Sequence, residues 1–284
     1  MDKRMEEILN MYENSALDLD DSFQFKCREC GKCCKNREDI MLTTRDLYNI
    51  ARDLGRTMEK IVRRYCEVYI GKDSHVPIIR LRPVGPDKMC PLLHNKKCIV
   101  HKVKPSVCAL FPLGRVAAFR KSDGEDKTFE DVKPKYFVWS VTCGTKDQTQ
   151  TVREWLERFG LPIEDEFYGP WNDTVTFLSI FFHEIEEKKP PQQAMEFLWN
   201  AAIQMLYIDY DPKEALLSQF HENSTKIRGL FHAIKEESER VFGGPLQCLA
   251  LGPVRVESAA AKPVIASNVT TMAELRRKLG ALIS

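Results

Sequence analysis

Apolar residues recur at helical spacing along much of the chain. In the segment TTRDLYNIARDLG, Leu47, Ile50 and Leu54 fall on one helical face, and Thr43 or Thr44 is the candidate N-cap. The same spacing, interrupted by Gly and Pro, predicts further helices over residues 57–70, 148–160, 172–188, 192–208 and 213–240. The second half of the chain therefore reads as mostly helical.

Two stretches of the first half have an extended pattern instead. Residues 75–86 contain VPIIRLRPVGP, and the prolines favour a strand that ends in a turn. After Phe111-Pro112 we expect a β-hairpin, in which GRVAAF leads into the polar turn KSDGEDK and KYFVWSVTC returns to Cys143. Gly124 in the turn and the β-branched and aromatic residues of the return strand support this hairpin.

These elements predict an α+β fold. An irregular cysteine-rich metal-binding domain with a β-hairpin precedes a mostly α-helical C-terminal half. The tail, from Gly243 onward, is rich in Gly, Ala, Pro and Val, which favours a mobile linker. We expect four parts: an N-terminal helix (1–21), a cysteine-cluster domain (22–145), a helical region (146–242), and a mobile tail with a short terminal helix (243–284).

Composition narrows the class of protein. The 284 residues are 43% hydrophobic and 29% charged, which is typical of a globular chain whose stability need not come from disulfides. The N-terminus lacks a signal-peptide pattern, and no stretch approaches the ~20 apolar residues that span a bilayer. We therefore expect a cytoplasmic protein without membrane contact, whose ten cysteines stay reduced and serve metal binding or thiol chemistry.

Positive charge coincides with the cysteines. The net charge is +1, yet residues 26–37 and 96–108 each carry +4, which leaves −7 on the rest of the chain. Nearby cations lower the pKa of a thiol and favour the thiolate that a metal needs. The balanced net charge and the lack of interleaved aromatics argue against a nucleic-acid partner.

The cysteine spacing predicts a metal site. The run C-x2-C-x2-C-C begins at Cys27, and its two-residue gaps let successive thiolates turn toward one ion or cluster. Gly31 fits such a turn because a positive φ costs glycine little. The run is similar to the start of a ferredoxin cluster site and to a zinc knuckle with one extra ligand. The candidate ligands are Cys27, Cys30, Cys33, Cys34, Cys90, Cys98, Cys108 and Cys143.

The adjacent pair Cys33-Cys34 leaves the partition of the thiols open. Neighbouring side chains in extended backbone point to opposite sides, so one member can complete a first site while the other faces elsewhere. Eight thiols could make two four-ligand sites, or one cluster plus thiols with another role. Thiolate-only sets suit both zinc and an iron–sulfur cluster, and the extra thiol favours iron slightly.

Two motifs resemble a known family. One is F-x-C-x2-C-G-x-C-C, from Phe25 to Cys34, and the other is C-x-L-x5-C-x-V-H-x2-K-P-x2-C-x2-F-P, from Cys90 to Pro112. Over residues 22–145 the chain resembles the CxxCxxCC, or YkgJ, family of zinc- or iron-chelating domains. The resemblance implies that the same eight cysteines are the metal ligands. It extends to the cysteine domain of flagellin lysine N-methylases, which makes protein lysine methylation one reading by analogy.

Three functions are thus open. A zinc or iron–sulfur centre could serve a redox or protein-modifying reaction, or zinc could staple a non-catalytic module that binds a protein partner. Methylation is the third, although no Gly-rich fingerprint for S-adenosylmethionine occurs in the sequence. Whether the protein is an enzyme is left open, because no Walker loop, G-x-S-x-G or H-E-x-x-H motif occurs.

The remaining cysteines and histidines read as ordinary. Cys66 is expected to be a buried helix cysteine and Cys248 a free thiol. Among the histidines near the cysteines, His101 is the best candidate for a neighbour of the centre. His75 and His94 are weaker candidates, and three others on predicted helices without ligand spacing carry no ligand role: His183, His221 and His232.

Overall fold

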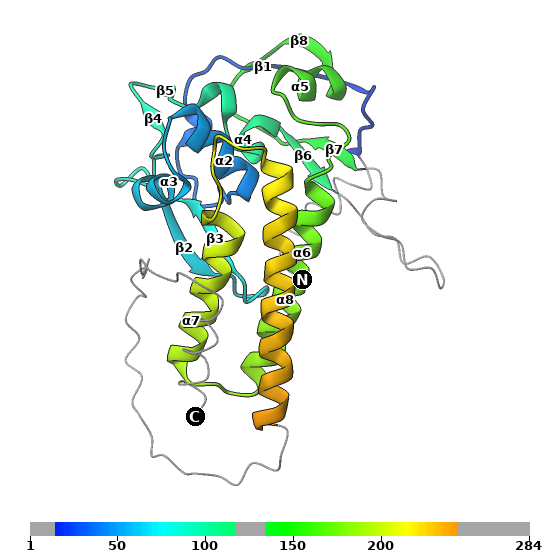
Figure 1. Ribbon diagram of the computed structural model, residues 1–284. Helices are drawn as coiled ribbons and strands as arrows, with labels where there is room; N and C mark the ends of the chain where they lie inside the picture. Colours follow the sequence, from blue (N-terminus) through cyan, green and yellow to red (C-terminus); the bar gives the residue numbers. More distant parts are fainter. Residues whose placement is uncertain (1–14, 117–133, 243–284) are drawn as a thin grey trace. The chain divides into compact units, whose positions relative to one another are not determined.

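The computed structural model describes residues 15–116 and 134–242 (Figure 1). The chain forms two compact units. The first, called the cysteine unit, takes the chain up to Cys66 and again from Arg80 to Gly169. The second, called the helical unit, takes Glu67–Ile79 and the chain from Pro170 onward. Residues 1–14, which hold most of the expected N-terminal helix, the turn of the hairpin and the tail with Cys248 lie outside the described residues.

The described strands form separate two-stranded sheets rather than one large sheet. β1 pairs antiparallel with β8, with a register shift between Gln24 and Lys26. The pair β6–β7 confirms the predicted hairpin. The bounds are β1 Ser22–Lys26, β2 Cys66–Ile70, β3 Pro77–Leu81, β4 Leu93–His94, β5 Lys97–Cys98, β6 Leu113–Val116, β7 Lys135–Val138 and β8 Thr145–Thr151. β2 pairs with β3 and β4 with β5.

The helices of the cysteine unit are short. Thr43 caps α2 through a capping box with Asp46, which confirms the predicted helix start. The α-helices are α2 Thr44–Asp53, α3 Met58–Tyr65, α4 Ser106–Leu110 and α5 Val152–Arg158. Two 3₁₀ turns, η1 Lys32–Cys34 and η2 His101–Val103, lie within the cysteine clusters.

The core of this unit joins its first strand to its last helix. Phe23 and Phe25 alternate with exposed residues along β1 and pack edge-on against Trp155 of α5, with ring centroids 5.8 and 5.7 Å apart. The indole Nε1–H of Trp155 donates to the carbonyls of Ala109 and Leu110, each at 3.2 Å. This bond fixes α4, the helix that carries Cys108, against the core.

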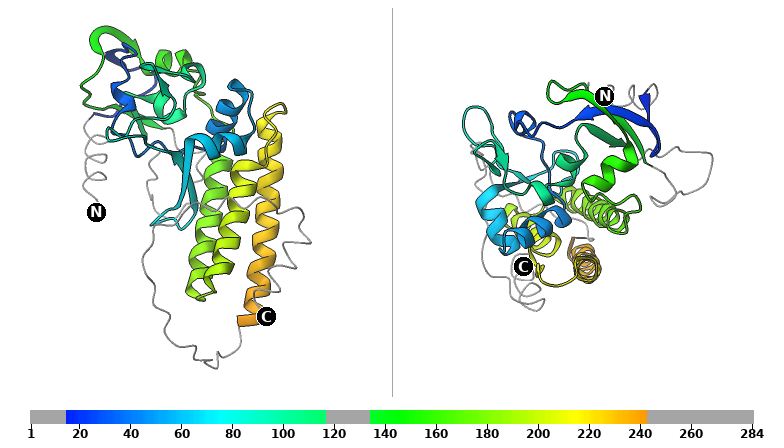
Figure 2. Two further views of the ribbon diagram at one scale, coloured as in Figure 1. Left: turned by 90° about the vertical axis from the view of Figure 1, so that its left-hand side faces the viewer. Right: turned by 90° about the horizontal axis from the view of Figure 1, so that it is seen from above.

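The helical unit rests on three long helices. Figure 2 shows α6 (Tyr168–Glu187), α7 (Gln192–Ile203) and α8 (Leu216–Phe242) lying side by side. A π-helical turn, η4 (Gln204–Ile208), follows α7. Their core contains the buried rings of Phe181, Phe182 and Phe231, with Phe181 and Phe231 centroids 4.7 Å apart. The predicted helices over 172–188, 192–208 and 213–240 and the α+β fold class are confirmed.

Two predicted helices are partly wrong. The stretch predicted as a helix over 57–70 ends its helix at Tyr65, and Cys66–Ile70 is strand β2. Cys66 is buried as expected, but in a strand rather than a helix. The stretch 148–160 begins as β8, and its helix α5 starts only at Val152. In both cases strand pairing, with β3 and with β1, overrides the local helical pattern.

No helix among the described residues is long and apolar enough to cross a membrane.

Candidate metal centre

All eight predicted cysteines line one cavity of about 280 Å³ in the cysteine unit. They come from the loop after β1, the β4–β5 region, α4 and the segment before β8. The structure thus brings together residues from segments that are far apart in the sequence, from Cys27 to Cys143. None of the described cysteines forms a disulfide.

The first cluster is shaped by a tight turn. Gly31 has φ 69°, the left-handed conformation that the sequence predicted for it, and its carbonyl accepts from the Cys34 backbone N–H at 3.1 Å. Cys33 and Cys34 follow in the 3₁₀ turn η1. The backbone N–H of Glu29 points at the Cys27 sulfur, 3.4 Å away. The loop therefore curls around its own thiols.

The second cluster is joined to the first through the backbone. The Cys90 N–H donates to the Cys34 carbonyl at 2.8 Å, and the Cys90 carbonyl accepts from Leu93 at 3.1 Å. Leu93 pairs with Cys98 in the β4–β5 hairpin. The backbone segments that carry Cys34, Cys90 and Cys98 therefore lie next to one another.

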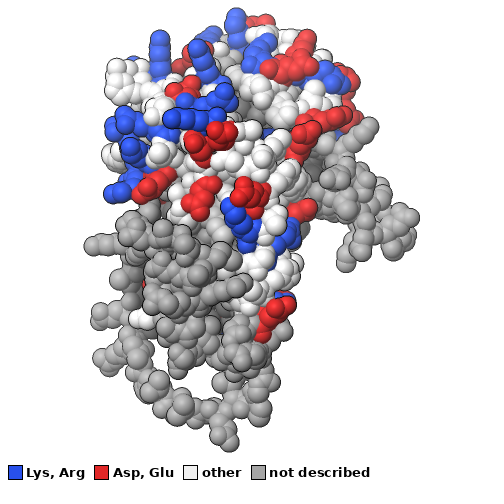
Figure 3. All heavy atoms as spheres, in the orientation of Figure 1, with Lys and Arg blue, Asp and Glu red and all other residues white. Residues whose placement is uncertain are grey.

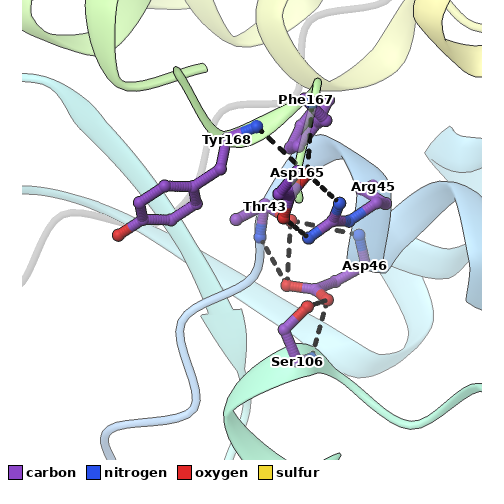
Figure 4. Close-up of polar contacts among 7 residues, drawn as sticks. All are labelled: Thr43, Arg45, Asp46, Ser106, Asp165, Phe167 and Tyr168. Atoms are coloured by element: carbon purple, nitrogen blue, oxygen red, sulfur yellow. Dashed lines mark hydrogen bonds and ion pairs between the residues drawn. The ribbon is translucent and has the colours of Figure 1, made fainter. Parts of the chain in front are cut away.

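A buried carboxylate positions Cys108. Asp46 Oδ1 accepts from both the backbone N–H and the hydroxyl of Ser106, at 2.8 and 2.7 Å (Figure 4). Its Oδ2 accepts from the backbone N–H and hydroxyl of Thr43, at 2.9 and 3.0 Å. One side chain thus joins the start of α2 to the start of α4, two residues before Cys108.

An ion pair in the same region ties α2 to the end of the unit. The Arg45 guanidinium binds both Asp165 oxygens, at 2.6 and 2.8 Å (Figure 4). Asp165 also accepts from the backbone N–H groups of Phe167 and Tyr168. The bidentate geometry and the low exposure of both side chains make this the best-formed ion pair near the site.

Cys143 is brought to the cavity by a close backbone approach. The residue after it, Gly144, has φ 74°, and a Cβ there would lie 2.4 Å from the Phe25 ring and 2.7 Å from the Lys26 carbonyl oxygen. Only glycine allows β8 to approach β1 so closely at this point. The Lys26–Thr145 pairing then places Cys143 next to the strand end that leads into Cys27.

Cations surround the cavity. Of the described residues that line it, Glu29 is the one acidic side chain, and its Oε1 lies 4.0 Å from His101 Nε2. Figure 3 shows Lys and Arg side chains gathered over the β4–β5 region of this unit. The cavity-lining cations are Arg28, Arg37, Lys96, Lys97, Lys102 and Lys104.

The adjacent cysteines Cys33 and Cys34 have opposite proton affinities. The Cys34 thiol donates a hydrogen bond that lowers the pKa of Cys33 to about 6, and the charges of Lys104 and Arg37 help. The pKa of Cys34 is raised because the thiol gives its proton to that bond and because it is half-buried. Near neutral pH this pair thus presents one thiolate.

Burial acts in the other direction on most of the remaining thiols. It raises the pKa of Cys90, Cys98, Cys108 and Cys143. These groups are neutral thiols at neutral pH in the absence of a cation. A metal that enters the cavity must therefore displace their protons.

The donor set fits zinc or iron. The side chains are soft sulfur donors, and cations stand ready to compensate the charge of several thiolates. Among the described residues, no group of three or more His, Cys, Asp or Glu side chains is already arranged to hold an ion.

Sequence reasoning missed several residues that shape this site. It did not single out Asp46, Arg45 or Asp165. The Thr-x-x-Asp spacing from Thr43 to Asp46 is a capping-box pattern that could have flagged Asp46 as fixed, but not its bond to Ser106. His101 lines the cavity as expected for a neighbour, whereas His94 is not among the lining residues.

A known protein family matches the part of the chain that contains most of the cavity cysteines. The family described as “Putative zinc- or iron-chelating domain” matches this chain from residue 26 to residue 136. Residues 26–136 match the CxxCxxCC family. The matched range holds seven of the eight cavity cysteines, and Cys143 lies beyond it.

One relative is distant. “Uncharacterized protein MJ0661” of Methanocaldococcus jannaschii is 28% identical over 88 residues, which is 31% of this chain and 44% of the relative. The match thus spans less than half of the relative's length. No solved structure matches the chain.

Proposed function

We propose that the protein is a metal-binding protein that holds zinc or an iron–sulfur cluster in the thiol cavity of its CxxCxxCC domain. One observation carries the proposal: eight cysteines from distant segments of the chain line the same cavity. Core filling does not explain them, because Cys27 and Cys30 are exposed and the other six are only partly buried.

The residues have distinct roles in this proposal. The eight cysteines supply the ligands. The cations Arg37 and Lys104 stabilise the negative charge of the thiolates, since both face Cys33. An iron–sulfur cluster would supply one-electron chemistry for a redox or protein-modifying reaction, whereas zinc would staple the unit. We favour iron, because the C-x2-C-x2-C run offers more thiols than a closed zinc knuckle requires.

Elemental analysis of protein purified without oxygen tests this function. We expect tightly bound zinc or iron, and in the iron case brown protein with sulfur-to-iron charge-transfer absorbance. Cys90→Ser should lower the metal content, because it removes a cavity ligand. Cys66→Ala is the matched control, since Cys66 is a cysteine of β2 that does not line the cavity. Protein free of zinc and iron would refute the function, and colourless zinc protein would remove the iron–sulfur version.

A second candidate function is favoured by the outer cations. Lys97 and Lys102 are exposed at the cavity and have no acidic partner among the described residues. In this alternative, the domain is a metal-stapled module that binds an acidic segment of a protein partner.

Charge reversal tests the alternative. Labelled polyglutamate should bind in a salt-dependent way, and Lys97→Glu with Lys102→Glu should weaken it by about tenfold. Arg56→Glu with Lys60→Glu is the control, because it changes the net charge equally at exposed positions outside the cavity. Equal loss in both double variants, or preferential binding of an oligonucleotide, would refute a specific acidic-protein surface.

A further inference from the structure

Backbone contacts sort the cavity cysteines into two groups. In the first, Cys34 and Cys90 are joined by a direct backbone hydrogen bond of 2.8 Å. Cys90 is joined to Leu93 at 3.1 Å, and Leu93 is the strand partner of Cys98. Cys108 enters the same cavity from α4.

The second group gathers where β1 and β8 meet. Lys26 pairs with Thr145, so the chain leaves this pair toward Cys27 on one side and Cys143 on the other. The close approach of Gly144 to the Lys26 carbonyl holds the two strand ends together. Cys30 lies between Cys27 and the Gly31 turn, and it lines the cavity together with Cys27 and Cys143.

Cys33 and Cys34 lie at the boundary between these groups. They are consecutive residues of the 3₁₀ turn η1. The two-residue spacing of Cys27, Cys30 and Cys33 puts Cys33 with the second group, whereas the backbone of Cys34 is bonded to Cys90 of the first. With Cys33 in the second group and Cys34 in the first, each group has four thiols.

We infer that the cavity contains two separate four-thiol metal sites, a partition that rests on the proposed metal-binding function. The inner site consists of Cys34, Cys90, Cys98 and Cys108. The outer site consists of Cys27, Cys30, Cys33 and Cys143. Four thiolates are the full ligand set of a structural zinc ion and of an iron–sulfur cluster, so each group is chemically complete.

The two sites differ in access. Cys27 and Cys30 of the outer site are exposed, whereas every cysteine of the inner site is at least partly buried. The inner site is also built on α4, which Asp46 and Trp155 hold in place. The outer site lies on a loop and two strand ends. The inner metal is therefore structural and slow to exchange, and the outer metal is open to solvent, chelators and reaction partners.

Cobalt reconstitution of the full chain tests the partition. Titration with Co²⁺ without oxygen should end at two ions per chain, with the thiolate charge-transfer band of four-sulfur sites. A chelator should remove one ion at least about tenfold faster than the other, because the outer ligands are exposed. Cys30→Ser should abolish the fast phase alone and leave the slow phase unchanged.

Double variants make the assignment specific. Cys30→Ser with Cys143→Ser should still bind one ion, since both changes fall in the outer site. Cys30→Ser with Cys98→Ser should bind none, since each site loses a ligand. Cys66→Ala should bind two. Should Cys98→Ser unfold the unit, the Cys30→Ser and Cys143→Ser series still decides the grouping.

The contrary outcomes are distinct. One ion per chain, or an equal loss of both phases in Cys30→Ser, would overturn the partition and leave the proposed function intact. Retention of an ion by Cys30→Ser with Cys98→Ser would show that the groups are drawn wrongly. Failure to bind any metal would refute the proposed function itself, as elemental analysis of the purified protein would show independently.

Discussion

The cysteine unit is built from short elements, whereas the helical unit rests on long helices. The longest helix of the cysteine unit, α2, has 10 residues, while α6 has 20 and α8 has 27. Helices as short as α4, with 5 residues, are not stable by themselves. The cysteine unit therefore depends on cross-links between its elements, and the helical unit depends on aromatic packing. The comparison predicts different responses to the loss of metal and of core contacts.

Metal removal should have the largest effect and should act on the cysteine unit alone. A structural four-thiolate zinc site contributes roughly 10–16 kcal/mol of apparent binding free energy, comparable with the whole stability of a domain at about 5–15 kcal/mol. A chelator should abolish amide-hydrogen protection in α2 and α4 and leave it in α6 and α8. Equal loss of protection in both units, or no loss in either, would show that the two units do not differ in their dependence on metal.

Shortening an aromatic side chain in the core of the helical unit should destabilise that unit and leave the metal content of the cysteine unit unchanged. Phe231 is fully buried between Phe181 and Phe182, so Phe231→Ala should lower the free energy of unfolding of the helical unit by about 3–5 kcal/mol. Ile180→Ala, at an exposed position of α6, should change it by less than about 0.5 kcal/mol. Urea unfolding measures both, and the metal content should stay unchanged. Loss of metal in Phe231→Ala would contradict independent stabilisation.

Helices α2 and α5 each begin with a capping box, but the box of α2 also holds α4 through Asp46 and Ser106. Asp46→Ala removes a cap and also the acceptor of two Ser106 bonds, so it should cost about 2–4 kcal/mol and weaken metal retention. Glu154→Ala breaks the matching capping box with Thr151 in α5. Among the described residues this box has no link to another helix, so the change should cost about 1 kcal/mol. Denaturation and metal content compare the two. Equal costs would show that the Ser106 bonds contribute nothing.

The variant with the smallest expected effect tests the close contact between Gly144, which precedes β8, and the end of β1. Gly144→Ala introduces a Cβ against the Lys26 carbonyl and the Phe25 ring at positive φ, so it should cost about 1–3 kcal/mol and lower the affinity of the outer site. Gly160→Ala also has positive φ but meets nothing within 4 Å, and should cost about 1 kcal/mol without affecting metal. Metal titration distinguishes them. Equal affinity in both variants would remove the role assigned to this contact.

The long helices were predictable because their periodicity agrees with their packing. Residues Ile227, Leu230, Phe231 and Ile234 recur at helical spacing in α8, and all are buried. The capped start of α2 was predictable for the same reason, since Thr43 is both a good N-cap residue and the observed cap. Local sequence and tertiary packing favour the same structure at these positions.

The strands β2 and β8 were not predictable from their own sequences. Cys66–Ile70 continues an apolar pattern that suits a helix, and it becomes a strand because β3 pairs with it. Thr145–Thr151 is polar throughout, and Gln150 is its one buried residue among those that the structure describes. Its strand character comes from pairing with β1, a partner more than 100 residues away in sequence.

The cysteines of the site were predictable, but their surroundings were not. Two-residue spacing and clustering are visible in the sequence, and all eight thiols line the cavity. The grouping of Cys34 with Cys90, and the support of Cys108 by Asp46, depend on contacts between distant segments. The metal itself stays a prediction, because identity and number of ions follow from chemistry that spacing alone does not determine.

The path of the chain through residues 67–79 affects how the protein can be dissected. This segment belongs to the helical unit although its flanks belong to the cysteine unit. There, the Tyr207 hydroxyl donates to the Pro77 carbonyl at 3.4 Å, and His75 is hydrogen-bonded to Glu186. No single proteolytic cut can therefore release either unit whole. A fragment that ends before α6 would keep the β2–β3 hairpin but lose its packing partners, and the buried Val76 and Ile79 would face water.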